Sequence, residues 1–186
     1  MRKFKLQTQV SVDGYMCGPG GEMDWTTDPW SDDLNAYVTE LTAPIDLIVL
    51  GRKLAEGFIP HWAAAKAAGE DGADAMNDTP KVVVSTTLAA SPWDNAVVAG
   101  GDLAETIDGL KAQPGGDMIA YGGGTLVRAL LALGLLDEIH LLVTPAALGG
   151  GMPVFADLGT HQRLRLVDAR PFDCGIVALH YAPPAA

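Results

Sequence analysis

The densest group of residues that could bind a ligand is a run of three glycines. Gly122, Gly123 and Gly124 follow an apolar segment, Asp117 to Tyr121, and precede Thr125 and a leucine-rich segment. We expect a buried strand before the glycines and a helix after them. The first turn of a helix has unpaired N–H groups, and glycines let an anion approach them closely. The run therefore predicts a phosphate site, with Thr125 adding a hydroxyl; a tight turn without a ligand is the alternative.

A second glycine, Gly51, stands in a similar position. It ends an apolar segment, Asp46 to Leu50, and is followed by Arg52 and Lys53. Cations at the start of a helix oppose the helix dipole, so they need a separate reason to be there. A phosphate bound by backbone amides and an arginine fork would supply that reason. The sequence therefore predicts a second phosphate contact, with solvated helix-start charges as the alternative.

A third polar segment follows the apolar residues Lys81 to Val84. Ser85 and Thr86 carry hydroxyls at its carboxyl end. By themselves they are typical of a turn or a helix cap. If the three apolar segments are parallel strands, however, their polar ends face one crevice at one edge of the sheet. We therefore expect Ser85 and Thr86 to lie with the two glycine turns around one ligand.

Other common kinds of chemical site are missing from the sequence. The glycine run is neither G-x-G-x-x-G nor a Walker A loop, since no Gly-Lys-Ser/Thr follows it. His61, His140, His161 and His180 show no metal-ligand spacing with one another or with cysteine. No serine stands in a nucleophile elbow. We therefore expect no metal centre and no catalytic triad.

Two acids, Asp32 and Asp33, open a predicted helix with Ser31 as its N-cap. Stabilisation of the helix dipole explains at least one of them. A buried carboxyl group with a raised pKa could instead donate a proton near neutral pH. Helix stabilisation and acid catalysis are therefore the two alternatives for this pair.

The chain as a whole has the composition of a globular protein. It has 186 residues, of which 48% are apolar and 19% charged, and these fit a single domain over residues 1–186. The formal net charge of −11 repels phosphate backbones and anionic lipid, so we expect neither nucleic acid nor membrane as a partner. Two cysteines make no disulfide framework, and the basic N-terminus lacks the apolar region of a signal peptide. These features indicate a cytoplasmic protein.

The elements that would position these residues alternate between strand and helix. The predicted strands are Phe4–Val12, Asp46–Leu50, Lys81–Ser85, Ala96–Ala99, Asp117–Tyr121, Glu138–Thr144, Arg163–Phe172 and Gly175–Tyr181. The predicted helices are Ser31–Leu41, a short one from Gly51 that ends at Gly57 and Pro60, Leu103–Ala112, and one from the glycine run to Leu133. Residues 61–79 are helical or irregular, and residues 15–30 form a glycine-rich loop.

This order predicts an α/β fold with three layers. Alternating strands and helices give a mostly parallel central sheet with helices on both faces. The last two strands are joined by a turn at Asp173 and Cys174 that is too short for a crossover. We therefore expect a mixed sheet with an antiparallel C-terminal edge.

Five segments together resemble the dihydrofolate reductase-like superfamily, and within it the bacterial group related to the reductase domain of the riboflavin-biosynthesis deaminase-reductase. They occur in the family order and cover nearly the whole chain: Val10–Tyr15, Leu50–Lys53, Val82–Thr86, Tyr121–Gly124 and Val143–Phe155. The resemblance implies a dihydrofolate reductase-like fold, NADPH as the cofactor, and a homodimer.

The resemblance also implies roles for individual residues. It places Gly51, Arg52 and Lys53 at the phosphates on the adenosine side, with Ser85 and Thr86 near the 2′-phosphate and the adenine. It places a second group on the pyrophosphate, namely Gly123, Gly124 and Thr125. The other cofactor-binding positions that it implies are Val10, Met16, Tyr121, Gly122 and Leu126. Residues 13–25 then form a lid over the nicotinamide.

The implied catalytic acid is Asp33. The segment Asp33–Tyr37 is similar to the pattern of acid, leucine and aromatic residue that opens the first helix of folate reductases, and Asp32 is the second choice. Two positions depart from the folate pattern. Asp78–Pro80 replaces an arginine that would hold the folate glutamate, and Leu142 replaces a threonine that would pair with the pterin. These differences argue against dihydrofolate as the substrate.

The leading hypothesis is an NADPH-dependent reductase that transfers a hydride to a small heterocycle of the riboflavin-pathway or pterin type. An NADPH-binding sensor or partner-binding module without turnover is the alternative from a different class. A third possibility is a folded protein whose glycine turns bind nothing.

Overall fold

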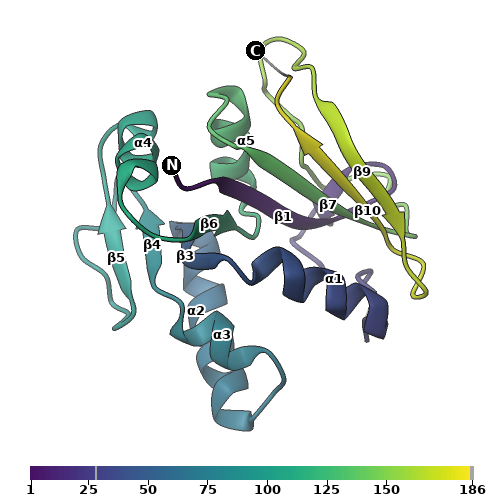
Figure 1. The fold of residues 1–186 in the computed structure, drawn as a ribbon, viewed down its shortest axis with the longest axis horizontal. Coiled ribbons are helices and arrows are strands. Elements are labelled where there is room, and N and C mark those ends of the chain that lie inside the picture. The colour runs from purple at the N-terminus through teal and green to yellow at the C-terminus, as the bar shows by residue number, and fades with distance from the viewer. Residues whose placement is uncertain (28, 185–186) are drawn as a thin grey trace.

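The computed structural model describes residues 1–27 and 29–184, which form a layered α/β fold (Figure 1). Within these residues the main sheet has eight strands in the order β5-β4-β3-β6-β1-β7-β10-β9. Its strands are β1 (Phe4–Ser11), β3 (Ile45–Gly51), β4 (Lys81–Val84), β5 (Ala96–Ala99), β6 (Asp117–Ala120), β7 (Glu138–Thr144), β9 (Arg165–Pro171) and β10 (Val177–Ala182). Two further short strands, β2 (Tyr15–Cys17) and β8 (Met152–Pro153), pair with each other.

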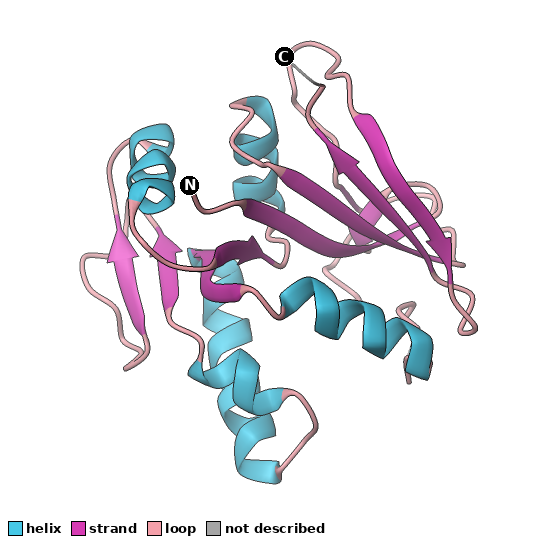
Figure 2. Cartoon of the chain, viewed as in Figure 1, coloured by secondary structure: helices cyan, strands magenta, loops and turns pink. Residues whose placement is uncertain are grey.

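Helices cover both faces of the main sheet (Figure 2). They are α1 (Asp32–Thr42), α2 (Arg52–Ala68), α3 (Ala73–Asp78), α4 (Leu103–Ala112) and α5 (Gly124–Ala132). Ile107 of α4 and Leu130 of α5 are fully buried in the core cluster that contains Phe4 of β1. Ile59 of α2 and Leu34 of α1 are buried in clusters on the opposite face. The structure thus confirms the predicted three-layer arrangement.

The strand directions also follow the prediction. The six strands from β5 to β7 run parallel to their neighbours, whereas β10 is antiparallel to both β7 and β9. As a consequence, the carboxyl ends of β1, β3, β4, β6 and β7 lie at one edge of the sheet. This edge is where a ligand of an open α/β sheet is expected to bind.

The predicted end of the helix after Gly51 is wrong, because α2 continues through Gly57 and Pro60 to Ala68. A proline in a helix interior costs about 3 kcal/mol relative to alanine. Ile59 and Ala65 of the same helix are buried, and this burial offsets the cost. Tertiary packing has overridden the local signal for a helix end.

The prediction of a plain loop over residues 15–30 is also incomplete. This segment contains β2, which pairs with β8 much later in the chain. Such a pairing leaves no local pattern in so short a strand. The loop is therefore held down at its start by a segment that lies far away in the sequence.

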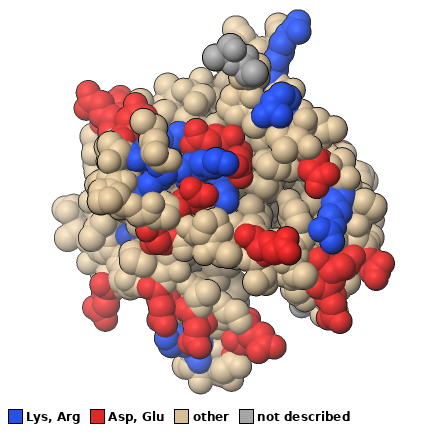
Figure 3. Space-filling model, viewed as in Figure 1, with Lys and Arg blue, Asp and Glu red and all other residues tan. Residues whose placement is uncertain are grey.

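Charged side chains are unevenly distributed over the molecule. In the view of Figure 3, acidic groups are widely spread, while many basic groups gather in one region among acids. Ion pairs occupy the amino ends of the central strands, where their members are Arg2 with Asp46, Lys3 with Glu138, Lys5 with Asp117, and Lys111 with Asp137. Among the described helices, none is long and apolar enough to cross a membrane.

Candidate cofactor and substrate site

The first turns of α2 and α5 lie side by side at the carboxyl edge of the sheet. Strands β3 and β6 are neighbours, and the helices that follow them leave toward opposite faces. A Cβ atom at Gly51 would lie 3.3 Å from Cβ of Leu126, and one at Gly123 would lie 3.5 Å from Cβ of Leu54. Opposite departures from neighbouring strands create a crevice between the helix ends. The structure thus brings the two predicted glycine turns together.

The backbone at the glycine run requires glycine. Gly122 has a φ of +119° and Gly123 a φ of +85°, which side-chain-bearing residues rarely adopt. Gly123 and Gly51 are the N-cap residues of α5 and α2, and no side chain caps either helix end. The amides of both first turns therefore lack a side-chain acceptor and keep the partial positive charge of a helix N-terminus. This arrangement is suited to an anion.

The cations and hydroxyls that the sequence indicates have protein partners. Arg52 Nη1 lies 2.6 Å from Glu56 Oε1, one turn along α2, so the guanidinium would exchange partners to bind a phosphate. Ser85 Oγ accepts hydrogen bonds from the amides of Thr87 and Leu88. Ser85 therefore forms the turn that its residue type also predicts. The side chains of Lys53 and Thr86 are exposed near this edge.

The apolar members of the predicted set are packed in the hydrophobic core. Val10, Met16 and Leu126 are buried in one core cluster. Tyr121 is stacked on Phe58 with ring centroids 5.7 Å apart, and burial raises the pKa of its hydroxyl. Tyr121 thus fills the space under α2 and keeps its proton. Thr125, in contrast, is exposed in the first turn of α5.

The β2–β8 pair closes one side of this edge. A Cβ atom at Gly124 would overlap Met152, and it would lie 3.5 Å from Cε of Met16. A Cβ atom at Gly151 would overlap the carbonyl oxygen of Cys17. Methionine side chains from both strands therefore pack against the start of α5, and the glycines allow the close approach.

Asp13 joins the loop after β1 to the segment after β7. Its carboxylate accepts hydrogen bonds from Ser11 Oγ at 2.6 Å, from the Gly149 amide at 2.7 Å and from the Leu148 amide at 3.1 Å. These bonds lower the pKa of Asp13 to about 2. The sequence reasoning placed Asp13 only at the start of a lid, and its role as the link between two loops was missed.

The expectation of a buried acid with a raised pKa is wrong for Asp33. Its side chain is only half-buried, and it accepts hydrogen bonds from Ser31 Oγ at 2.5 Å and from the Asp173 amide at 3.2 Å. The bond from Ser31 is the main reason why the pKa of Asp33 is lowered. Asp32 is exposed at the start of α1. Asp33 is thus ionised at neutral pH and links α1 to the hairpin between β9 and β10.

A polar pair that the sequence reasoning missed lies at the carboxyl ends of β1 and β7. Thr144 is buried, and its hydroxyl donates to Oε1 of Gln9 over 3.3 Å. Residue alternation places Thr144 on the same sheet face as Leu142, which packs against Leu34 of α1. This pair could hydrogen-bond a polar ligand between α1 and the sheet. Only the pairing of β1 with β7 identifies it.

A second polar cluster lies at the other end of β7. Side-chain atoms of Glu138, His140 and His180 all lie within 4.8 Å of one another. Because His180 comes from β10, no sequence spacing could reveal this group.

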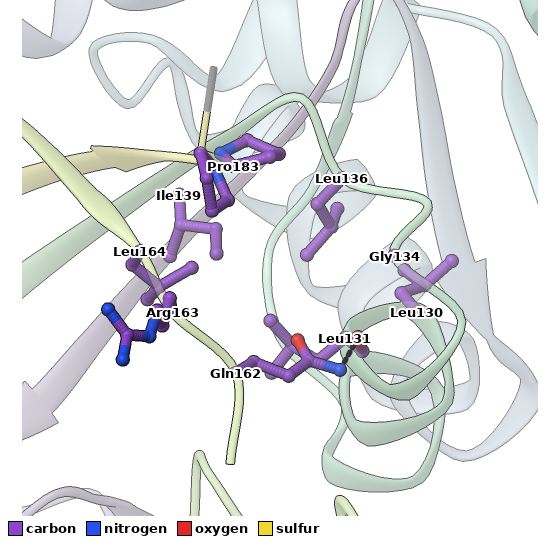
Figure 4. A pocket seen from close by; sticks show the side chains of 10 residues that line it. Leu130, Leu131, Gly134, Leu136, Ile139, Gln162, Arg163, Leu164 and Pro183 are labelled. Carbon is purple, nitrogen blue, oxygen red and sulfur yellow. Dashed lines mark hydrogen bonds between the residues drawn. The ribbon is translucent and has the colours of Figure 1, made fainter. Parts of the chain in front are cut away.

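The open pocket in Figure 4 is separate from the glycine turns. It has a volume of about 290 Å³ and lies between the carboxyl half of α5, the start of β7 and the chain before β9. Its lining includes Leu131, Leu136 and Leu164, with Gln162 donating to the carbonyl of Leu131 over 2.6 Å. None of its lining residues belongs to the predicted cofactor set.

The sheet order and the paired helix ends define a class of protein, the α/β proteins with a dihydrofolate reductase-like fold. Within this class, the chain belongs to the family described as the RibD C-terminal domain, which matches residues 2–178. A Bacillus subtilis relative, the uncharacterized protein YyaP, is 32% identical over 97% of this chain and 94% of its own length.

Solved structures show the same fold at low sequence identity. A protein of Shewanella sp. PV-4, named for riboflavin biosynthesis, has a TM-score of 0.78 at 22% identity, covering 98% of this chain and 99% of its own. The deaminase and 5-amino-6-(5-phosphoribosylamino)uracil reductase of Thermotoga maritima has a TM-score of 0.71 at 16% identity, covering 98% and 57%. A dihydrofolate reductase of Enterococcus faecalis has a TM-score of 0.59 at 14% identity, covering 96% and 93%.

Proposed function

We propose that the protein is an NADPH-dependent reductase of a small heterocyclic compound, of the riboflavin-pathway pyrimidine or pterin type. The observation that carries the proposal is the pair of uncapped helix N-termini, α2 and α5, that meet at the carboxyl edge between β3 and β6. A dinucleotide has several phosphates, and two adjacent sets of free amides suit such a ligand. The Enterococcus faecalis reductase of the same fold was solved with NADP(H) bound.

The residues present fit this cofactor. Amides at the start of α5, beside Gly123 and Thr125, would bind the pyrophosphate. Amides at the start of α2 would bind the adenosine-side phosphates together with Arg52 and Lys53. Arg52 would then leave Glu56, a partner that is half-exposed and holds it weakly. The positive charges of Arg52 and Lys53 favour NADPH over NADH, because NADPH carries an additional phosphate on the adenosine side.

The reduction needs a hydride, which NADPH would supply to a C=N or C=O carbon, and a proton at the adjoining atom. Asp33 is ionised and so does not itself store that proton. Its carboxylate instead accepts a hydrogen bond from a substrate N–H or from a water molecule that delivers the proton. The Thr144–Gln9 pair orients the polar edge of the substrate. The β2–β8 pair and the Asp13 link exclude bulk water.

A thermal-shift comparison of NADPH, NADH and no ligand tests the cofactor. Free ligand at one hundred times its dissociation constant stabilises the folded state by about 2.7 kcal/mol. We expect NADPH to raise the melting temperature at lower concentrations than NADH. A screen of pterins and ribosylaminopyrimidines, followed by the loss of reduced-nicotinamide absorbance, then tests turnover. No shift with either nucleotide would contradict the proposal.

A second candidate is an NADPH-binding protein without turnover, acting as a sensor or a partner-binding module. The observation that favours it is the structural use of Asp33, whose oxygens are already bonded to Ser31, Leu34 and Asp173. Such a protein would show the NADPH thermal shift and no oxidation with any compound of the screen.

We also propose that the protein is a cytoplasmic homodimer. All seven residues of the edge strand β9 are exposed, including the apolar Leu166 and Val167. An exposed edge strand is a template for pairing with another chain.

A further inference from the structure

Two histidines face one carboxylate at the amino end of β7. His140 of β7 and His180 of β10 are direct partners in the antiparallel pairing, and their rings are stacked with centroids 4.0 Å apart. Nε2 of His140 lies 3.2 Å from Oε2 of Glu138, and Nε2 of His180 lies 3.8 Å from the same oxygen. Both ring nitrogens thus converge on one carboxylate oxygen.

The hydrogen bonds of this cluster are incomplete. Nδ1 of His140 is bonded to the hydroxyl of Tyr37 at 3.0 Å. Nε2 of His180 is buried, and among the buried side-chain nitrogen and oxygen atoms of the described residues it is the one that has no hydrogen-bond partner. A buried polar atom without a partner is costly and calls for an explanation. A ligand bound between the two rings and the carboxylate would satisfy it.

The donor atoms of this cluster, two ring nitrogens and a carboxylate oxygen, suit a cation. Burial, and then the proximity of His180, lower the pKa of His140 to about 4. Burial also lowers the pKa of His180. An imidazole binds a metal through the lone pair of its unprotonated ring nitrogen. Burial opposes ionisation of Glu138, but hydrogen bonds from Lys3 and His140 outweigh it, so its pKa is lowered.

We propose that Glu138, His140 and His180 form a binding site for a divalent transition metal of the Zn²⁺ type. Two imidazoles and a carboxylate are a common set of three protein ligands for zinc, with water as the fourth. Imidazole ligands disfavour Mg²⁺ and Ca²⁺, which prefer oxygen. The site lies at the amino ends of the parallel strands, away from the glycine turns, and is therefore separate from the proposed cofactor site.

The distances are close to those of a zinc centre. With bonds of about 2.0–2.1 Å in a tetrahedral arrangement, ligand atoms lie about 3.3 Å apart. The pair of His140 and Glu138 already meets this spacing at 3.2 Å. His180 must approach Glu138 from 3.8 Å, and its ring must also rotate, because the two imidazoles are stacked with an angle of 19° between their planes and a metal lies in the plane of each ring that binds it. The side chain of His180 is the more exposed of the two histidines. Once Nε2 of His140 binds the metal, its Nδ1–H donates a hydrogen bond to the hydroxyl oxygen of Tyr37.

Neighbouring charged side chains influence the affinity of the proposed site for a metal ion. Lys3 Nζ lies 2.7 Å from Oε1 of Glu138, which leaves Oε2 for the metal. Lys5 Nζ lies 3.9 Å from Oε2 but is closer to Asp117, at 3.1 Å. Asp168 stands opposite His180 in the pairing with β9 and adds negative charge at the open side. The two lysines weaken metal binding, and the two aspartates offset them.

The test uses the full chain, stripped of metal with a chelator and desalted. We expect titration with ZnCl₂ alone to show one saturable equivalent per chain and a rise in the melting temperature. The variants His180→Ala and Glu138→Gln should each lower the affinity by at least about tenfold, since even outer-shell changes have effects of this size. His161→Ala is the matched control, because His161 is exposed and lies outside the cluster.

Cobalt provides a second readout. Co²⁺ bound by this ligand set should give the visible absorption of a four-coordinate complex, which His180→Ala should abolish and His161→Ala should keep. Glu138→Gln has nearly the same shape as the native residue, so it tests the ligand if the histidine variant fails to fold. Wild-type affinity in His180→Ala or Glu138→Gln, equal loss in His161→Ala, or no saturable uptake by the wild type would overturn the proposal.

Discussion

Replacing Gly123 with alanine should separate cofactor binding from stability. Gly123 has a φ of +85° and lies between the first turns of α5 and α2. The left-handed conformation costs a residue with a Cβ atom about 1–2 kcal/mol. Alanine also makes the unfolded chain less flexible than glycine does, and this stabilises the folded state by about 0.4–1 kcal/mol. We therefore expect a net loss of about 1 kcal/mol in the free energy of unfolding, or about 2–4 °C in melting temperature for a chain of this size.

The effect on NADPH should be larger and specific to this position. The new Cβ atom would lie 3.5 Å from Cβ of Leu54, in the gap through which a pyrophosphate reaches the amides. We expect at least a tenfold loss of NADPH affinity, which is about 1.4 kcal/mol.

The matched control is Gly134→Ala, at the opposite end of α5. Gly134 has a φ of +65°, and a Cβ atom there would meet no neighbour within 4 Å. This variant should lose a similar amount of stability and keep its NADPH affinity. Urea unfolding measures the first quantity, and a fluorescence titration with NADPH measures the second. Unchanged NADPH affinity in Gly123→Ala, or an equal loss in Gly134→Ala, would refute the placement of the pyrophosphate.

Three further predictions follow from the acids and the edge strand. Asp33→Asn should abolish turnover while NADPH binding persists, and Asp32→Asn should change neither; retained turnover in Asp33→Asn would exclude its role in proton delivery. The pKa of Asp13 falls from 3.8 to about 2 on folding, so its stabilisation is present above pH 4 and is lost as the pH falls toward 2. Asp13→Asn should therefore show a flatter decline of melting temperature over that range, and an unchanged slope would contradict the link. If β9 mediates the dimer, Leu166→Lys should give a monomer by light scattering, whereas a persistent dimer would place the interface elsewhere.

Local patterns were sufficient for most of the fold because the central strands are apolar and bounded by glycine, proline or polar residues. The predicted strand Glu138–Thr144 agrees with β7 at both ends, and the predicted helix Leu103–Ala112 agrees with α4. The errors occur where distant packing competes with local propensity. Helix α2 continues past Pro60 because Ile59 is buried against the core. Strand β2 forms within a predicted loop because it pairs with β8.

The sequence predicted only part of the candidate site. Glycines at strand ends indicate free amides at helix starts, because few other residues tolerate those conformations or such close approach. In contrast, the neighbouring residues in the sequence do not reveal which group a charged or polar side chain will contact. Arg52 is paired with Glu56, and Ser85 is used by its own turn. The lowered pKa of Asp33 depends on Ser31 and on a hairpin much later in the chain.

The sequence by itself determined the alternation of strands and helices, the two glycine turns and the family resemblance, since each depends on neighbouring residues. Only the tertiary structure decided which residues meet. Strand order placed the starts of α2 and α5 together, and the pairing of β7 with β10 placed His140 beside His180. Contacts of this kind join segments far apart in the chain, and no local spacing encodes them.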